Sequence, residues 1–378
     1  MINFSINKTF FLHALQIAKK AISSKNAIPI LSTLKLDVKS DEIILTASNG
    51  QISIETFLSS QNENAGLLIN ETGSILLEAN FFINVVSSLP ESTLDIEEIE
   101  NYQILLKSGK SLITLKGKDT DFYPHLQDIK TTNSLSLSTK VLKSLISETA
   151  FAASLQESRP ILTGVHMLLN DKKEFKAIAT DSHRMSQRQI ILENSQTEFD
   201  VVIPSKSLRE LSSILTDDIE TIEVYFSDSQ MLFKTESISF YTRLLEGNYP
   251  DTDRLLTNHF ETEVTFNTTV LKHAMERAHL ISNATQNGTV KLEMLTNKVT
   301  AYVNSPEVGK VNEEIDTIHQ SGNDLTISFN PTYLIEALKA FNSETVTIRF
   351  ISSVRPFTLT PEDDKENFIQ LITPVRTN

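Results

Sequence analysis

The residues with the clearest chemical potential are Asp181, Ser182 and His183, which are adjacent in the chain. A carboxylate, a hydroxyl and an imidazole are the groups of a nucleophilic triad, and Asp and His are also metal ligands. A metal centre usually needs three or four ligands, and no second cluster of His, Asp and Glu stands at ligand spacing. The absence of Cys excludes a thiol nucleophile, thiolate metal ligands and disulfides. We therefore expect no catalytic residue, no metal and no cofactor, with a metal- or His-dependent nuclease as the alternative.

The elements that would position these residues form a threefold repeat. A pattern of apolar, hydroxyl, apolar and helix-capping residue occurs at 4–7, 135–138 and 264–267. The copies lie 131 and 129 residues apart (135 − 4 and 264 − 135), which is the size of a domain. Two Tyr-Pro pairs, Tyr123–Pro124 and Tyr249–Pro250, are turn signals typical of linkers. The sequence therefore predicts three similar domains over residues 1–127, 128–253 and 254–378.

Each predicted domain consists of two smaller units, each with one helix and several strands, which makes the fold class α+β. The side chains of Asn7, Ser138 and Asn267 are expected to cap the first helix of each domain. Helical periodicity predicts the second helices around 80–86, 205–211 and 331–337. Alternating strands follow each of them at 93–96, 221–224 and 345–348. Helices that recur at equivalent places in six units should share one face of the assembly.

Charge is distributed unevenly between these helices and the rest of the chain. The net charge is −14. The six helix windows (5–25, 78–90, 136–156, 204–215, 267–283 and 330–341) carry 11 bases and 5 acids, or +6, so the remainder carries −20. A basic helical face with an acidic exterior favours a body that surrounds a polyanion.

The composition also bears on the cellular compartment. No run approaches the ~20 apolar residues of a membrane span, and the N-terminal residues lack the pattern of a signal peptide. The lack of Cys agrees with a reducing compartment. We expect a cytoplasmic protein without a membrane partner, which weighs against a surface adhesion module as a further alternative.

Five segments in order along the whole chain resemble the bacterial DNA polymerase sliding clamps, the beta subunits of the replicative polymerase. These segments are residues 179–185, 247–251, 329–334, 353–357 and 372–376. The resemblance implies a head-to-tail homodimeric ring in which helices line the hole and antiparallel sheet forms the outside. It further implies a non-catalytic protein that encircles double-stranded DNA. Its implied partners are the polymerase catalytic subunit, the clamp loader and other proteins that carry a clamp-binding motif.

The resemblance also implies a partner-peptide pocket between the second and third domains, with two departures from the family pattern. Ser182 stands where Gly is common, and Thr373 stands where Met is common. Five of the residues, Leu162, Met185, Leu255, Leu371 and Val375, are expected to contact apolar peptide side chains, and Arg159, His183 and Arg184 to hold the polar part. The implied pocket comprises Arg159 and Leu162 from a strand, with Thr180, Ser182, His183, Arg184, Met185, Pro250, Leu255, Asn330, Tyr333, Ser353, Leu371, Thr373, Pro374, Val375 and Arg376.

Two further surfaces are implied in the same way. The ring would close between Ile113 and Leu115 on an edge strand of one chain and Leu280 and Ile281 at a helix end of the other, unless these four residues belong to ordinary cores. Lys25 and Gln156 match positions that line the hole and contact DNA, and the basic first helix adds Lys20.

Overall fold

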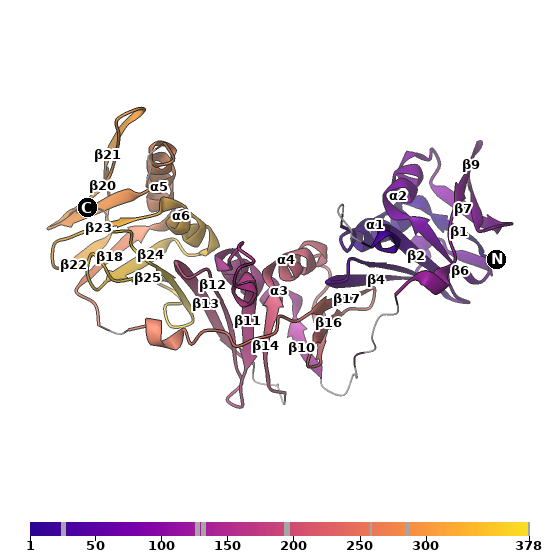
Figure 1. Cartoon of the computed structure of the whole chain (residues 1–378), viewed down its shortest axis with the longest axis horizontal. Helices are drawn as coiled ribbons and strands as arrows, with labels where there is room; N and C mark the ends of the chain where they lie inside the picture. The colour runs from indigo at the N-terminus through magenta and orange to yellow at the C-terminus, as the bar shows by residue number, and fades with distance from the viewer. Residues whose placement is uncertain are drawn as a thin grey trace. The chain divides into compact units, whose positions relative to one another are not determined.

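The computed structural model describes residues 1–23, 28–124, 129, 134–192, 197–257, 259–284 and 288–376. Figure 1 shows the helices and strands along the chain, which divides by its contacts into two compact units. The first comprises Met1–Val141 and Glu210–Leu244, and the second comprises Leu142–Arg209 and Leu245–Asn378. The central part of the chain thus contributes to both units, and two of its helices, α3 (Thr139–Thr149) and α4 (Ser205–Ile214), cross the boundary between them.

The first unit contains two antiparallel sheets and the helices α1 (Lys8–Lys19) and α2 (Ala79–Ser88). One sheet has the order β5-β1-β7-β8-β9, and the other has the order β10-β15-β16-β17-β4-β3-β2-β6. The strands are β1 (Asn3–Asn7), β2 (Thr33–Val38), β3 (Glu42–Ser48), β4 (Ile52–Ser59), β5 (Leu68–Glu71), β6 (Gly73–Glu78), β7 (Thr93–Ile99), β8 (Gln103–Ser108), β9 (Ser111–Lys116), β10 (Ser134–Ser138), β15 (Thr221–Phe226), β16 (Gln230–Lys234) and β17 (Ile238–Arg243).

The second unit repeats this plan with α5 (Thr268–Ser282) and α6 (Pro331–Ala340). Its sheets have the orders β14-β11-β12-β13-β26-β25-β24-β18-β22 and β21-β20-β19-β23. The strands are β11 (Gly164–Leu169), β12 (Glu174–Thr180), β13 (Arg184–Ile191), β14 (Phe199–Pro204), β18 (Thr262–Asn267), β19 (Val290–Leu295), β20 (Lys298–Ser305), β21 (Gly309–Ile315), β22 (His319–Gly322), β23 (Leu325–Phe329), β24 (Thr345–Phe350), β25 (Phe357–Pro361) and β26 (Phe368–Ile372).

Helices α1 and α5 begin at side-chain caps, and α1 buries one apolar face. The Asn7 side chain accepts a hydrogen bond from the backbone N–H of Phe10, and Asn267 accepts from those of Thr269 and Val270. These contacts satisfy N–H groups that have no partner within the helix. In α1 the apolar residues recur on one face and are buried, and the Phe11 ring packs edge-to-face on Phe4 and Phe82. The predicted caps Asn7 and Asn267 are confirmed, and the cap at Ser138 stays a prediction. The second helices are confirmed, as are the strands β7, β15 and β24 that follow them.

The sheets also explain why the compact units differ from the sequence repeats. β17 of the central part pairs with β4, and β13 pairs with β26. Each pairing joins strands of two predicted domains by a ladder of backbone hydrogen bonds. The compact units therefore follow the sheets, and each contains strands from more than one predicted domain. The boundaries at 127/128 and 253/254 stay predictions.

One local expectation is wrong. Arg159 and Leu162 do not lie on a strand, because Pro160 begins a short 3₁₀ helix, η5 (Pro160–Thr163). Proline fits the first helical position, where its missing N–H leaves no bond unmade. Among the described residues, no helix is long and apolar enough to cross a membrane.

Candidate protein-partner site

The Asp181-Ser182-His183 segment forms a tight turn between β12 and β13. The Asp181 carboxylate accepts hydrogen bonds from the backbone N–H groups of His183 (2.9 Å) and Arg184 (3.0 Å). Its second oxygen accepts from Nε of Arg184 at 3.1 Å. The carboxylate therefore holds the turn and Arg184, and it does not orient an imidazole as a triad requires. In the part of the chain that the structure describes, no group of three or more His, Asp and Glu residues could hold a metal ion.

Ser182 occupies the left-handed region of the backbone in this turn, with a φ of 76°. The Oγ1 atom of Thr180 accepts the backbone N–H of Ser182 (3.1 Å) and donates to the carbonyl of Arg184 (2.6 Å), which fixes this conformation. A residue with a Cβ atom is strained there by about 1–2 kcal/mol, and glycine is not. Glycine would therefore adopt this turn with less strain than Ser182 does.

The turn predicts opposite effects for two substitutions. Ser182→Gly should raise stability by about 0.5–1 kcal/mol, because relief of strain exceeds the added freedom of the unfolded chain. Ser182→Val should lower stability by more than about 1 kcal/mol, because a β-branched residue is least tolerated at positive φ. Thermal unfolding of the full chain measures both effects. An unfolding midpoint for Ser182→Val equal to that of the unmodified chain would contradict the left-handed turn.

Arg184 is the centre of an internal network. Besides Asp181, its guanidinium pairs with the carboxylate of Glu336 on α6 and donates to the carbonyl of Phe151 at 2.8 Å. It also lies over the ring of Tyr333, 4.8 Å from the ring centre, and its side chain is only 11% exposed. The guanidinium is therefore engaged within the chain, so its first role is to join β13 to α6. Exposed cations near this turn come from Arg159 and Arg376.

The network places two aromatic rings on the surface of the site. The ring of His183 is exposed and stacks on Tyr333 at 6.4 Å between ring centres, with 11° between the planes. Burial raises the pKa of the Tyr333 hydroxyl above its ordinary value. Asn330 caps α6 by accepting the backbone N–H of Thr332 at 2.9 Å, which fixes the start of the helix that carries Tyr333. Ser353 is exposed in the loop between β24 and β25.

The apolar part of the site has a buried floor and an exposed rim. Met185 and Leu371 are 1% and 4% exposed and form a small cluster with Ile178, against which Tyr249 and Leu256 pack. Leu162 is also buried. Leu255 and Val375 are 49% and 38% exposed. Of the five expected apolar contacts, only these two therefore offer a large free surface. Met185 and Leu371 form a floor that is already packed within the chain, and Leu162 is buried as well.

Sequence reasoning missed Tyr249 as a structural member of the site. Its hydroxyl accepts the backbone N–H of Thr180 at 3.0 Å, and its ring stacks on His166 at 4.9 Å between centres. Burial raises the pKa of the Tyr249 hydroxyl well above its ordinary value, which keeps the hydroxyl neutral. The only signal in the sequence was the Tyr-Pro pair of the linker. Pro250, which follows, is exposed.

The C-terminal segment is tied to the same site by backbone hydrogen bonds. The N–H of Thr373 donates to the carbonyl of His183 at 2.8 Å, and the N–H of Val375 donates to that of Ser328 at 2.7 Å. Pro374 lies between them. The structure thus brings the predicted residues of the turn, of α6 and of the C-terminal segment into one continuous region of the second unit.

The residues expected at the ring interface have different environments. Ile113 and Leu115 lie on β9, an edge strand, but Leu115 is buried within its own unit and Ile113 is half-buried. Leu280 is 73% exposed near the end of α5, whereas Ile281 packs partly against the core. Leu280 is therefore the only one of the four that is exposed in the single chain.

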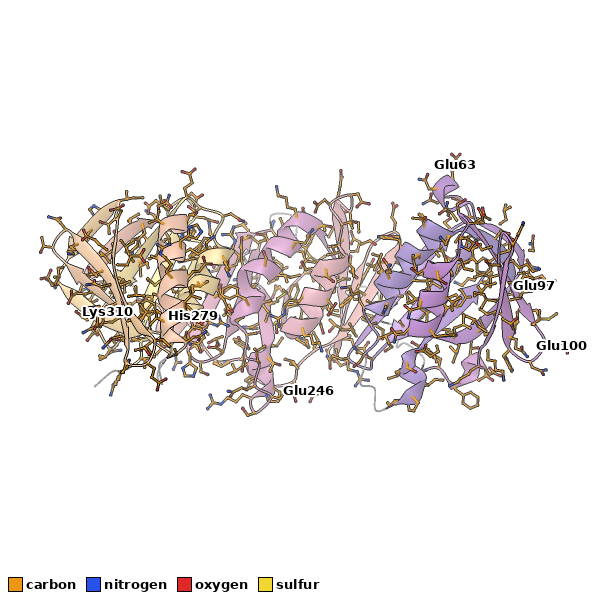
Figure 2. All side chains as sticks on the ribbon, turned by 90° about the horizontal axis from the view of Figure 1, so that it is seen from above. Glu63, Glu97, Glu100, Glu246, His279 and Lys310 are labelled. Atoms are coloured by element: carbon orange, nitrogen blue, oxygen red, sulfur yellow. The ribbon has the colours of Figure 1, made fainter. Side chains whose placement is uncertain are left out.

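Several basic side chains of the helices are paired within the chain, so the helices present less positive charge to a ligand than their composition indicated. Arg277 of α5 pairs with Glu313, Lys339 of α6 pairs with Glu276 at 3.8 Å, and the guanidinium of Arg209 on α4 donates to the carbonyl of Ala150. Lys20 and Gln156 are exposed, and Lys25 lies outside the described residues. Figure 2 shows Glu97 and Glu100 at the edge of the first unit, where the Glu97 carboxylate pairs with Lys107.

The fold and the site define a protein built from repeated helix-and-sheet domains, with a candidate partner surface in its second unit. Models of the DNA polymerase III beta subunit match its N-terminal domain at residues 2–127, its central domain at 136–251 and its C-terminal domain at 253–376. The beta sliding clamp of Streptococcus pneumoniae R6 is 66% identical over 378 residues, all of both chains. The crystal structure of the beta subunit from Streptococcus pyogenes has a TM-score of 0.96 and 68% identity, and that of the Bacillus subtilis sliding clamp has 0.96 and 39%, each over all of both chains.

The chain therefore belongs to the DNA polymerase III beta subunit family, the bacterial sliding clamps. This membership establishes the three clamp domains and a role in DNA replication. Members of the family are processivity subunits without catalytic activity, so this chain is a non-catalytic accessory subunit of a DNA polymerase. The nuclease and adhesion alternatives are thereby set aside.

Proposed function

We propose that two copies of the chain close head-to-tail into a ring around duplex DNA and tether replication proteins through the site at β12, β13, α6 and the C-terminal segment. The observation that carries this proposal is the combination of a preformed apolar floor with an exposed rim of Leu255, Val375 and His183. Linear peptide motifs bind to such surfaces because the receptor is already ordered. The partners would be the polymerase catalytic subunit, the clamp loader and other proteins carrying a clamp-binding motif, all in the cytoplasm.

Ring closure is supported by two sheet edges. β9 ends a sheet in the first unit and β21 ends a sheet in the second, and within the described residues each has a neighbour on one side only. Unpaired edge strands expose backbone groups that can pair with another chain. Pairing of β9 with β21 of a second copy would continue the sheets and cover Leu280. A head-to-tail contact of this kind closes when two copies complete a full turn.

A closed ring holds DNA by topology, so it needs no strong basic patch. The exposed Lys20 would make weak, salt-screened contacts that permit sliding. This agrees with the strongly acidic chain and with the internal pairing of several helix bases.

Retention on DNA tests the topological proposal. After loading by a clamp loader, the protein should stay on nicked circular DNA through gel filtration and run off the same DNA once it is linearised. The expected difference is a near-complete loss on linear DNA, and blocking both ends of the linear molecule should restore retention. Equal retention on circular and open-ended linear DNA would refute the ring.

A further inference from the structure

The boundary between the first and second domains repeats the backbone of the partner site. At this first junction, Asn49 Oδ1 accepts the backbone N–H groups of Gln51 and Ile52, both at 2.9 Å. Asp181 does the same for His183 and Arg184. The N–H of Gly50 donates to Ser48 Oγ at 3.2 Å, as that of Ser182 donates to Thr180 Oγ1. The central residue has positive φ in both turns, 87° at Gly50 and 76° at Ser182.

The elements around the two turns also correspond. The N–H of Arg243 at the end of β17 donates to the carbonyl of Gln51 at 3.0 Å, as that of Thr373 donates to His183. A 3₁₀ helix that begins with proline precedes each turn in the chain, η1 (Pro29–Ser32) at the first junction and η5 at the second. Each presents a buried leucine, Leu31 or Leu162, both 4% exposed. The first junction is therefore a second copy of the scaffold of the partner site.

This first scaffold encloses a cavity of about 260 Å³ that lies wholly within the first unit. Its apolar walls come from Ile28, Leu31 and Pro124, and among the described residues that line it Arg243 is the only charged one. The volume is close to the lower end of known ligand pockets, and it accommodates two or three side chains of a peptide.

The floor of the cavity is polar where the floor of the partner site is apolar. In the β17–β4 pair, Tyr241 faces Ser53, and at the equivalent register of the β26–β13 pair Leu371 faces Met185. Ser53 is 8% exposed and donates from its hydroxyl to Ser48 Oγ at 2.7 Å. Ser48 in turn donates to the carbonyl of Ile52 at 3.2 Å, so both hydroxyl protons are used within the chain and the floor offers a ligand hydroxyl oxygens as acceptors.

We propose that the first junction is a second peptide-binding site of different specificity. It takes a short extended segment with an aliphatic side chain against Ile28 and Leu31, a hydroxyl or amide side chain on the Ser53 floor, and a carboxylate that pairs with Arg243. The exposed guanidinium selects an acidic ligand because charge-assisted hydrogen bonds to a carboxylate are the strongest available there. That the ligand is a peptide rests on the proposed function of the second junction, whose scaffold this junction repeats.

Titration of the full-length chain with labelled Ile and Leu methyl groups tests the proposal by nuclear magnetic resonance. The probe is the acetylated and amidated pentapeptide Gly-Leu-Ser-Asp-Gly. It should cause saturable shifts of the methyl signals of Leu31 and Ile28, and no shift of Leu162. Replacing Asp by Asn in the probe, or Arg243→Gln in the protein, should weaken binding about three- to fivefold, as expected for an exposed ion pair. Lys234→Gln, which removes an exposed charge from the neighbouring strand outside the cavity, should leave binding unchanged.

The two junctions are separable in the same experiment. A peptide of the Gln-Leu-x-Leu-Phe kind should shift Leu162 and leave Leu31 unmoved. If that peptide shifts Leu162 while the acidic pentapeptide shifts neither Leu31 nor Ile28 up to its solubility limit, this inference falls and the proposed function stands. If the apolar peptide fails at Leu162, the proposed function falls. Shifts at Leu31 that persist undiminished in Arg243→Gln would refute the acidic specificity.

Discussion

Leu280→Asp should convert the dimer into a folded monomer at micromolar concentration. Leu280 is 73% exposed in the single chain, so a carboxylate there stays in water and leaves the fold intact. In the proposed ring interface the same carboxylate would be buried without a partner, which costs several kcal/mol and lowers the association constant by at least two orders of magnitude. Light scattering gives the mass of the particle, and circular dichroism confirms that the monomer is folded.

Two further variants sharpen this test. Leu295→Asp places the same charge on another exposed leucine of the second unit and should remain dimeric. Ile281→Asp should lower the stability of the monomer itself, because Ile281 packs partly against the core of that unit. A Leu280→Asp protein that stays dimeric at micromolar concentration would show that the interface lies elsewhere.

Deleting residues 374–378 should reduce the affinity for a Gln-Leu-x-Leu-Phe-like peptide at least thirtyfold while leaving the dimer intact. The deletion removes Val375, which is one of the two exposed apolar residues of the rim, and the backbone bond from Val375 to Ser328. Loss of a well-placed apolar contact and its support costs about 2 kcal/mol or more, which corresponds to the thirtyfold change. Fluorescence anisotropy of a labelled peptide measures the affinity without DNA.

The matched control removes only residues 377 and 378 and should bind the peptide with unchanged affinity. Stimulation of the polymerase should fall in parallel with peptide affinity, because both depend on the same site. Unchanged peptide affinity after deletion of 374–378 would rule out this site. Dissociation of the truncated protein into monomers would instead show that the C-terminal segment takes part in ring closure.

The sequence by itself determined the features that depend on neighbours along the chain. Asn7 and Asn267 cap their helices as predicted, because a cap bonds to N–H groups two or three residues away. The spacing of apolar residues located the helices, and the strand alternation located β7, β15 and β24. The expectation that Arg159 and Leu162 lie on a strand was wrong, because Pro160 between them begins a 3₁₀ helix.

Only the tertiary structure decided which of the site residues are available to a ligand. Arg184 pairs with Glu336, 152 residues further along the chain, and no local pattern reveals that its guanidinium is occupied. Leu162, Met185 and Leu371 are as apolar as Leu255, yet they are buried because other elements pack over them. The two junctions share the same pattern of backbone hydrogen bonds. Their sequences differ at equivalent positions, because Ser53 stands at the first junction where Met185 stands at the second. Burial and pairing depend on contacts between distant segments, and such contacts exist only once the sheets have formed.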